Sequence, residues 1–228
     1  MARGIKATLK VAAYGTSVSL GAFFVATRKN VFVPLDPTDA IFQHRLFREL
    51  NPSNNPTLND LCIRRIPISD IRPELFGKEG GLVEAFCAGV WSGWAYKPQR
   101  AILATTHQDT STQSQLWSPE ELRTSEYNIG TLVTDHFEVV EKTPETILMR
   151  SGDSPRNRAV REVDGLFEIS AITKPNEGIV EFGLKTYFFQ GLGKAQGPPV
   201  PAPVEWLHRQ YVKLLLETAV QNVISERT

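Results

Sequence analysis

Apolar and polar residues alternate in the last third of the chain in a way that predicts two β-hairpins. The first occupies residues 131–152 and the second residues 164–190. An apolar residue at every second position turns one face of each strand toward a core. The turn of the second hairpin contains Gly178, which suits a backbone with positive φ. Short strands joined by tight turns predict an antiparallel sheet.

A long amphipathic helix is predicted to begin near Pro203 and to follow these strands. Its apolar and charged residues fall on different faces, so one face is expected to be buried and the other to be in water. The apolar face carries Leu207, Tyr211, Leu214, Leu215, Thr218 and Ala219, and the charges at four-residue steps are Arg209, Lys213 and Glu217. A curved antiparallel sheet that wraps around such a helix is an α+β fold with space for an apolar guest.

The middle of the chain predicts a strand and two helices. Residues 61–68 form an apolar run that is typical of a strand, and residues 81–103 show the spacing of the main internal helix. Gly89 and Gly93 interrupt this helix, each at a cost of about 1 kcal/mol relative to Ala, and they indicate close packing or space for a ligand. Ser118 begins a shorter helix with a Ser cap, Pro at the first position and Glu in the first turn.

The N-terminal region is interpreted as a separate arm. Residues 11–27 form an uncharged run between basic residues, and three hypotheses fit it: a helix packed on the domain, a membrane anchor or interfacial helix, and a cleaved targeting segment. Residues 39–50 predict a short helix with Asp39 near its cap. A loop rich in Asn and Pro then precedes the strand, so the division is an N-terminal hydrophobic helix and extended or helical arm at 1–56 and a ligand-binding domain at 57–228.

Composition excludes little but disfavours one class of partner. Lys plus Arg and Asp plus Glu number 25 each, so the formal charge is zero. Proteins that bind nucleic acid usually carry a basic excess, and no nucleic-acid partner is expected. Cys62 and Cys87 lie in apolar surroundings, where they are interpreted as reduced core thiols, with one redox bridge or metal ligation as alternatives. No zinc-binding motif is present, and we expect no metal and no cofactor.

Several sequence segments carry a resemblance to a known family. They are NVFVPLDPTD, NPSNNPTLNDLC, FCAGVWSGWAY, TDHFEVVEKTPETILMRSGDS, DGLFEISA and PVEWLHRQY, within residues 30–211. Together they resemble a family of uncharacterised fungal proteins with a START-like, helix-grip domain, some of them associated with natural-product biosynthesis. The resemblance implies a deep apolar cavity between sheet and final helix. Related domains bind lipids, hormones or polyketides, and some catalyse cyclisation, dehydration or isomerisation without a cofactor. No catalytic residues are carried over from the family.

Three residues are candidates for acid–base catalysis. Asp135 and His136 are adjacent in a predicted strand, so their side chains should point to opposite faces and only one of them would face the cavity. His136 is the better general base because a free imidazole has a pKa of about 6.5. Glu168 lies within an apolar strand, where it either faces water or enters the cavity. Burial in the cavity would raise its pKa and make it a proton donor.

Aromatic and polar side chains supply the candidate binding residues. Trp91, Trp94 and Tyr96 form the densest aromatic group, interpreted either as core or as a wall of the cavity. His208 and Tyr211 share a face of the last helix and would bring polar tips to the cavity or its rim. The remaining candidates are Phe137, Met149 and Tyr187.

The leading hypothesis is a cofactor-independent fungal biosynthetic enzyme. It would bind an apolar polyketide-type or terpenoid-type substrate and direct a cyclisation, isomerisation or dehydration, a Diels–Alder type cycloaddition included. The alternative is a non-catalytic lipid or isoprenoid carrier with membrane contact through residues 1–29, and a regulatory binding module is a third hypothesis. The expected partner is a small apolar molecule, and both a monomer and a homodimer are compatible with the sequence. The expected location is intracellular, either cytoplasmic or membrane-associated.

Overall fold

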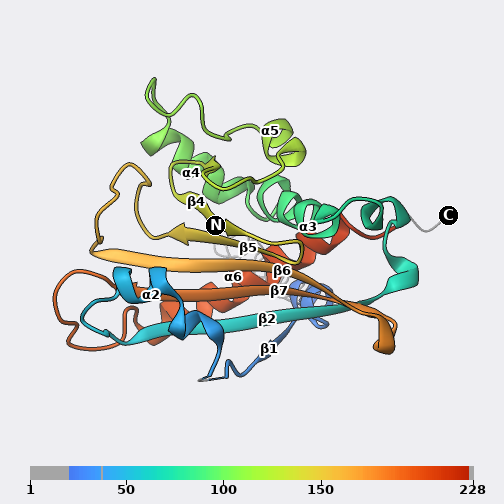
Figure 1. The fold of residues 1–228 in the computed structure, drawn as a ribbon, viewed down its shortest axis with the longest axis horizontal. Helices are drawn as coiled ribbons and strands as arrows, with labels where there is room; N and C mark the ends of the chain where they lie inside the picture. The colour runs from blue at the N-terminus through green and yellow to red at the C-terminus, as the bar shows by residue number, and fades with distance from the viewer. Residues whose placement is uncertain (1–20, 37, 226–228) are drawn as a thin grey trace, which may run out of the picture.

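In the computed structural model, which describes residues 21–36 and 38–225, seven strands form one curved antiparallel sheet (Figure 1). The strands stand in the order β1-β2-β7-β6-β5-β4-β3, so the last strand lies between the second and the sixth. Their bounds are β1 Val31–Val33, β2 Thr57–Pro67, β3 Leu132–Val133, β4 Phe137–Lys142, β5 Thr146–Ser151, β6 Val163–Lys174 and β7 Ile179–Gln190. The fold is α+β, as the alternating pattern predicted.

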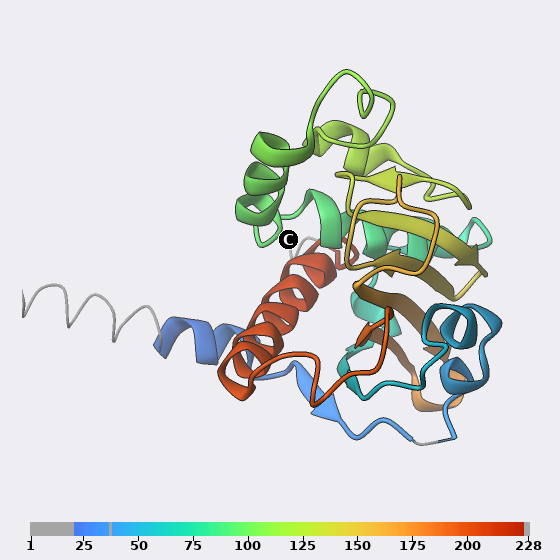
Figure 2. The ribbon, with the colours of Figure 1, turned by 90° about the vertical axis from the view of Figure 1, so that its left-hand side faces the viewer.

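Helices cover both faces of this sheet (Figure 2). One face packs against α3 and α6, and the other packs against η1 and α2. The helical bounds are η1 Ala40–Gln43, α2 Arg45–Leu50, η2 Ile68–Asp70, η3 Pro73–Phe76, α3 Gly81–Ser92, α4 Lys97–His107, α5 Pro119–Thr124, η4 Pro175–Glu177 and α6 Ala202–Gln221. The predicted C-terminal helix is thus confirmed, and it lies across the face that α3 also covers.

Alternation along β7 decides which side chains meet which helices. Phe182 and Leu184 belong to the main core beneath α3 and α6, whereas Tyr187 and Phe189 belong to a smaller core beneath α2. Successive side chains of a strand point to opposite faces of a sheet, so a residue's parity in β7 fixes the core that it enters. Both cores are therefore properties of one continuous sheet.

Two of the predicted helices are broken where the sequence pattern continues. The helix expected over 81–103 ends at Ser92, because Gly93 adopts an extended backbone, and α4 starts with a proline in its first turn. The helix expected over 39–50 is divided at His44 into η1 and α2. Its predicted cap is confirmed, since an Asp39 carboxylate oxygen accepts a hydrogen bond from the N–H of η1 at 3.1 Å.

The strand expected at residues 131–141 is also divided. Leu132–Val133 and Phe137–Lys142 are separate strands, and Thr134 and Asp135 between them have φ of 52° and 49°. The prediction that Asp135 and His136 lie within a strand is therefore wrong. A turn rather than strand alternation directs these two side chains.

Residues 30–50 are integrated with the rest of the fold. Strand β1 pairs with β2, and α2 packs on β6. The Asn30 side chain donates to the carbonyl of Lys213 in α6 at 2.8 Å. The boundary drawn between residues 56 and 57 thus separates segments that share one sheet. Residues 21–27 are helical, and residues 11–20 of the uncharged run lie outside the described residues.

Candidate functional site

A cavity of about 180 Å³ lies between the sheet and α6. We call it the inner cavity. It is bounded by strands β4 to β7, by α3 and α4, and by residues 208–215 of α6. Its lining consists of Trp91, Gln99, His136, Phe137, Ser151, Phe167, Thr186, Phe188, His208, Tyr211, Val212 and Leu215. A pocket therefore lies beneath the last helix, but it is small and partly open where a deep cavity was predicted.

Aromatic rings form one wall of the inner cavity. The Trp91 ring centroid lies 4.4 Å from that of Phe137 and 5.9 Å from that of Phe167. Tyr96 packs behind Trp91 at 4.9 Å and does not line the cavity. Trp94 does not join this group, because the break at the end of α3 turns it outward with 57% of its surface exposed. The sequence prediction of a cluster of Trp91, Trp94 and Tyr96 is wrong for Trp94.

Two hydroxyl groups that line the inner cavity have no hydrogen-bond partner among the described residues. Ser151 ends β5, Thr186 lies in β7, and both side chains are fully buried. Neither Ser151 Oγ nor Thr186 Oγ1 has a hydrogen-bond partner within residues 21–36 and 38–225. A buried polar group left unpaired costs about 1–3 kcal/mol. Both residues line the inner cavity, so a molecule that enters it meets two hydroxyls that no described side chain engages.

A buried carboxylate contacts the histidine of α6 at the same place. Asp60 of β2 is the Cα partner of Thr186, and its Oδ2 lies 3.4 Å from Nε2 of His208. The Asp60 side chain is 2% exposed and that of His208 is 21% exposed. Among the described residues, neither Asp60 oxygen has a hydrogen-bond partner that meets normal geometry. A carboxylate that orients an imidazole is a familiar acid–base pair, and such contacts are often long before substrate binds.

A turn held by several side chains places His136 at the inner cavity. The Thr134 hydroxyl lies 2.6 Å from the Tyr96 hydroxyl. The Asp135 N–H donates to Gln115 at 2.6 Å, and its carboxylate accepts from Gln115 at 3.0 Å and from Arg156 at 2.7 Å. Positive φ is unfavourable for a β-branched residue such as Thr134. These contacts offset that strain, and they direct Asp135 away from the cavity while His136 lines it.

Burial changes the chemistry expected of His136. Desolvation lowers its pKa from 6.5 to about 4, and the charges of His107 and Arg161 act in the same direction. The imidazole is consequently neutral at pH 7 and a weak base. The prediction of His136 as the better general base rested on its free pKa, and this environment makes it a neutral hydrogen-bonding group instead.

Two predicted site residues lie on the opposite face of the sheet. Glu168 forms an ion pair with Lys185 at 3.1 Å, beneath η1. Tyr187 packs edge-on against Phe42 and donates its hydroxyl proton to Asp39 at 3.3 Å. Strand parity separates both residues from α6, so the predictions that they enter the cavity are wrong. Burial raises the pKa of Tyr187 further above its usual value.

The remaining predicted binding residues divide into those at the cavity and one in the core. Phe137, His208 and Tyr211 line the inner cavity, and the Tyr211 hydroxyl donates to Gln99 at 2.8 Å. Met149 is fully buried in the main core on the cavity side of the sheet, but it does not line the cavity.

Asp60, Ser151 and Thr186 were missed from the sequence. Asp60 carries the clearest signal, since it stands at an inward position between Leu58 and Cys62 of one strand. A carboxylate within an apolar row of alternate residues indicates a site more strongly than a charge on the outer row. Ser and Thr give no such signal because both occur widely in strands.

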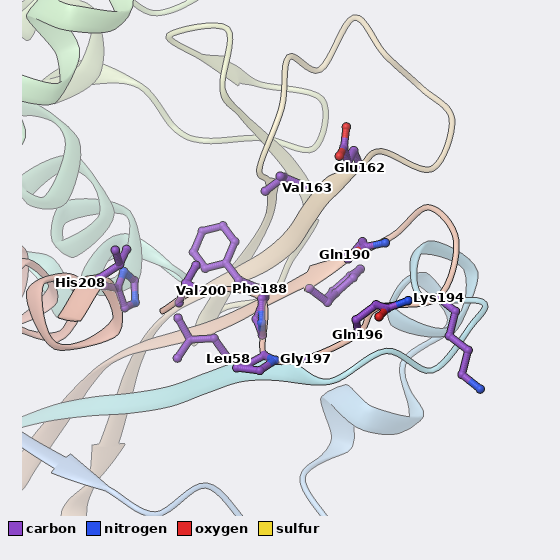
Figure 3. Close-up of a pocket in the computed structure, with 14 residues that line it drawn as sticks. Leu58, Glu162, Val163, Phe188, Gln190, Lys194, Gln196, Gly197, Val200 and His208 are labelled. Atoms are coloured by element: carbon purple, nitrogen blue, oxygen red, sulfur yellow. The ribbon is translucent and has the colours of Figure 1, made fainter. Parts of the chain in front are cut away.

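A larger groove adjoins the inner cavity (Figure 3). This outer groove has a volume of about 630 Å³ and lies under the loop of residues 191–201 that leads into α6. Its lining is Leu58, Glu162, Val163, Phe188, Phe189, Gln190, Lys194, Gln196, Gly197, Pro198, Pro199, Val200, Val204 and His208. Phe188 and His208 line both spaces.

The arrangement defines an α+β protein with a small pocket beneath α6, lined by aromatic rings, by two hydroxyls without a partner among the described residues and by His208, which contacts the buried Asp60. Comparison of the chain with protein-family models, with curated proteins and with solved structures finds no match. In residues 21–36 and 38–225, no three His, Cys, Asp or Glu side chains cluster as metal ligands. Cys62 and Cys87 are buried free thiols. No helix of the described segments has the length and apolarity to span a membrane.

Proposed function

We propose that this chain is a START-like, helix-grip protein that acts as a cofactor-independent enzyme on a small, oxygen-bearing, largely apolar substrate. The reaction would be a proton-transfer isomerisation, or the related dehydration or cyclisation, of a natural-product type molecule. The observation that carries this proposal is His208, which contacts the buried Asp60 and lines an aromatic-walled cavity with two hydroxyls that have no hydrogen-bond partner among the described residues. The order of the sheet and its C-terminal helix agrees with the helix-grip assignment.

Binding follows from the two walls of the inner cavity. The rings of Trp91, Phe137 and Phe167 favour a flat apolar portion of the substrate. The hydroxyls of Ser151 and Thr186 would donate hydrogen bonds to its oxygen atom. Negative charge that develops on that oxygen during enolisation would strengthen these bonds, and preorganised donors stabilise such charge effectively.

Proton transfer is assigned to His208. Its imidazole would take a proton from a carbon next to the substrate carbonyl, and Asp60 would stabilise the imidazolium that forms. The same imidazolium would return the proton to a second carbon, so the double bond moves and no co-reactant is consumed. Positioned acid–base groups of this kind contribute about 10²–10⁴ to a rate.

A test begins with binding of phenol, a single ring whose oxygen imitates an enolate. Fluorescence of the wild-type protein should report saturable binding, and Thr186→Val and Ser151→Ala should each weaken it. Isomerisation of 3-cyclohexen-1-one to its conjugated isomer, followed by ultraviolet absorbance, then tests the chemistry. His208→Gln and Asp60→Asn should lower the rate at least about 10²-fold. His107→Gln is the matched control, because His107 lies on α4 outside the cavity lining.

Absence of phenol binding would contradict the assigned site. Phenol binding with isomerisation no faster than in protein-free buffer, or equally fast with His208→Gln, would contradict the enzymatic role and leave a binding protein.

The second candidate function is a lipid or isoprenoid carrier that meets a membrane. The helical turns at residues 21–27 expose Phe24 and Val25, with 51% and 58% of their surfaces accessible, and Trp206 of α6 is also exposed. Exposed aromatic and aliphatic residues with adjacent Arg28 and Lys29 suit an anionic bilayer surface. Co-sedimentation with phosphatidylcholine–phosphatidylserine vesicles should be lost in a Phe24→Glu, Val25→Glu double variant. Equal co-sedimentation of both proteins would remove this candidate.

A further inference from the structure

The inner cavity is too small for the substrates expected of a biosynthetic enzyme. Its volume of about 180 Å³ compares with the engineered protein cavity of about 150 Å³ that binds benzene. It therefore accommodates little more than one ring. Sites for drug-sized molecules usually measure about 300–1,000 Å³, a range that the outer groove already reaches. Any larger ligand of the inner cavity must continue elsewhere.

Phe188 and His208 form the boundary between the two spaces, and a chain would pass from one to the other over these two rings. These side chains line both spaces, and their ring centroids are 5.9 Å apart in an edge-to-face arrangement. Phe188 is the Cα partner of Gly165 in the adjacent strand. A Cβ at Gly165 would stand 2.9 Å from Phe188 Cδ1 and 3.2 Å from Ser151 Oγ. The missing side chain at Gly165 lets the phenyl ring lie against β6 at the passage.

The outer groove offers an apolar surface beyond this passage. Val163 and Val204 face it with 55% and 49% of their surfaces exposed, and Val200 lies near Phe188 (Figure 3). The Lys194 side chain extends away from the groove in the same view. The groove therefore suits an uncharged aliphatic segment better than an anionic group.

We propose that the outer groove binds the aliphatic tail of a ligand whose ring occupies the inner cavity, the chain passing over the Phe188 and His208 rings that border both spaces. The substrate class is accordingly a single oxygen-bearing ring with an extended apolar chain. This inference rests on the proposed function for the position of the ring. It adds a second subsite, and with it a preference for tail length.

Phenols with lengthening 4-alkyl chains test the tail subsite. In the wild-type protein, affinity measured by titration calorimetry should rise from phenol to 4-propylphenol to 4-heptylphenol. The gain should reach up to about fourfold for each methylene that leaves water. Val204→Glu should abolish this gain and leave the dissociation constant of phenol unchanged. Ile129→Glu, at another exposed aliphatic residue, is the matched control and should behave as wild type.

The outcomes separate the two proposals. If phenol binds but the alkyl chain adds nothing, or adds equally in Val204→Glu, the tail subsite is wrong and the ring site stands. If phenol does not bind while 4-heptylphenol binds and Val204→Glu removes that binding, the groove acts alone and the ring site is wrong. A Phe188→Leu variant, which widens the passage, should keep the dependence on chain length, and loss of that dependence with phenol binding intact would also contradict the proposal.

Discussion

Acidification should destabilise the fold through His136. Burial of its imidazole holds the pKa at about 4 in the folded protein, against 6.5 for the unperturbed side chain. The charges of His107 and Arg161 contribute in the same direction, whereas Asp153 and Asp135 oppose it. The folded protein therefore resists a proton that the unfolded chain accepts readily.

The direction and size of the effect follow from linkage. Between pH 6.5 and about 4 the unfolded state binds more protons at this position than the folded state does. The free energy of unfolding consequently falls as pH falls through this window, and the contribution is constant above it. Since one pKa unit corresponds to about 1.4 kcal/mol, the loss by pH 4 is on the order of 3 kcal/mol.

Urea unfolding followed by tryptophan fluorescence measures this loss. Wild-type protein should lose about 2–3 kcal/mol more than His136→Gln between pH 7 and pH 4.5, because glutamine takes up no proton. The comparison cancels the carboxylates, which titrate in both proteins. An identical pH dependence in the two proteins would refute the argument that burial of this imidazole, rather than the surrounding acids, sets the acid sensitivity.

Three further substitutions test the packing that supports the site, each by urea unfolding at pH 7. Gly89→Ala should destabilise by about 1–3 kcal/mol despite its better helix propensity, because the new Cβ would lie 2.7 Å from the Ala219 carbonyl oxygen. A stabilised variant would show that α3 and α6 can separate freely. Tyr96→Phe should cost about 1–3 kcal/mol by leaving the Thr134 hydroxyl unpaired, and no change would contradict its role in the turn. Arg150→Met should cost about 3–5 kcal/mol, because it leaves the buried carboxylate of Asp164, now 2.6 Å from the Arg150 guanidinium, without its charged partner. A loss of stability smaller than that caused by an Arg→Met change at an exposed position would refute this.

The strands and the last helix could be predicted from the sequence because burial imposes a strict period on them. The capping box at Ser118 was predictable as well, since both of its hydrogen bonds are local. The turn before His136 was not predictable from the sequence. Its residues alternate like a strand, and only the distant side chains of Tyr96 and Gln115 hold them at positive φ.

The candidate site was only partly predictable, because residue type is visible in the sequence but the face of the sheet is not. Aromatic residues such as Trp91 and Phe137 are conspicuous, whereas the face on which Glu168 and Tyr187 lie depends on the register between strands. A shift by one position exchanges the two faces of a strand. The pairing of Asp60 with His208 joins residues from the two ends of the domain, and no local pattern records it.

The strand order carries a consequence for biosynthesis. Strand β2 ends at Pro67, and its long partner β7 begins at Ile179. At about 5–20 residues per second, a ribosome needs roughly 6–20 s to make the intervening chain. During this time the edge of β2 that later pairs with β7 has no partner strand. Such an edge is prone to pair with other nascent chains. Heterologous production should therefore improve with slower initiation or with chaperones that shield the early chain, and nonsense products ending before Gln190 should precipitate.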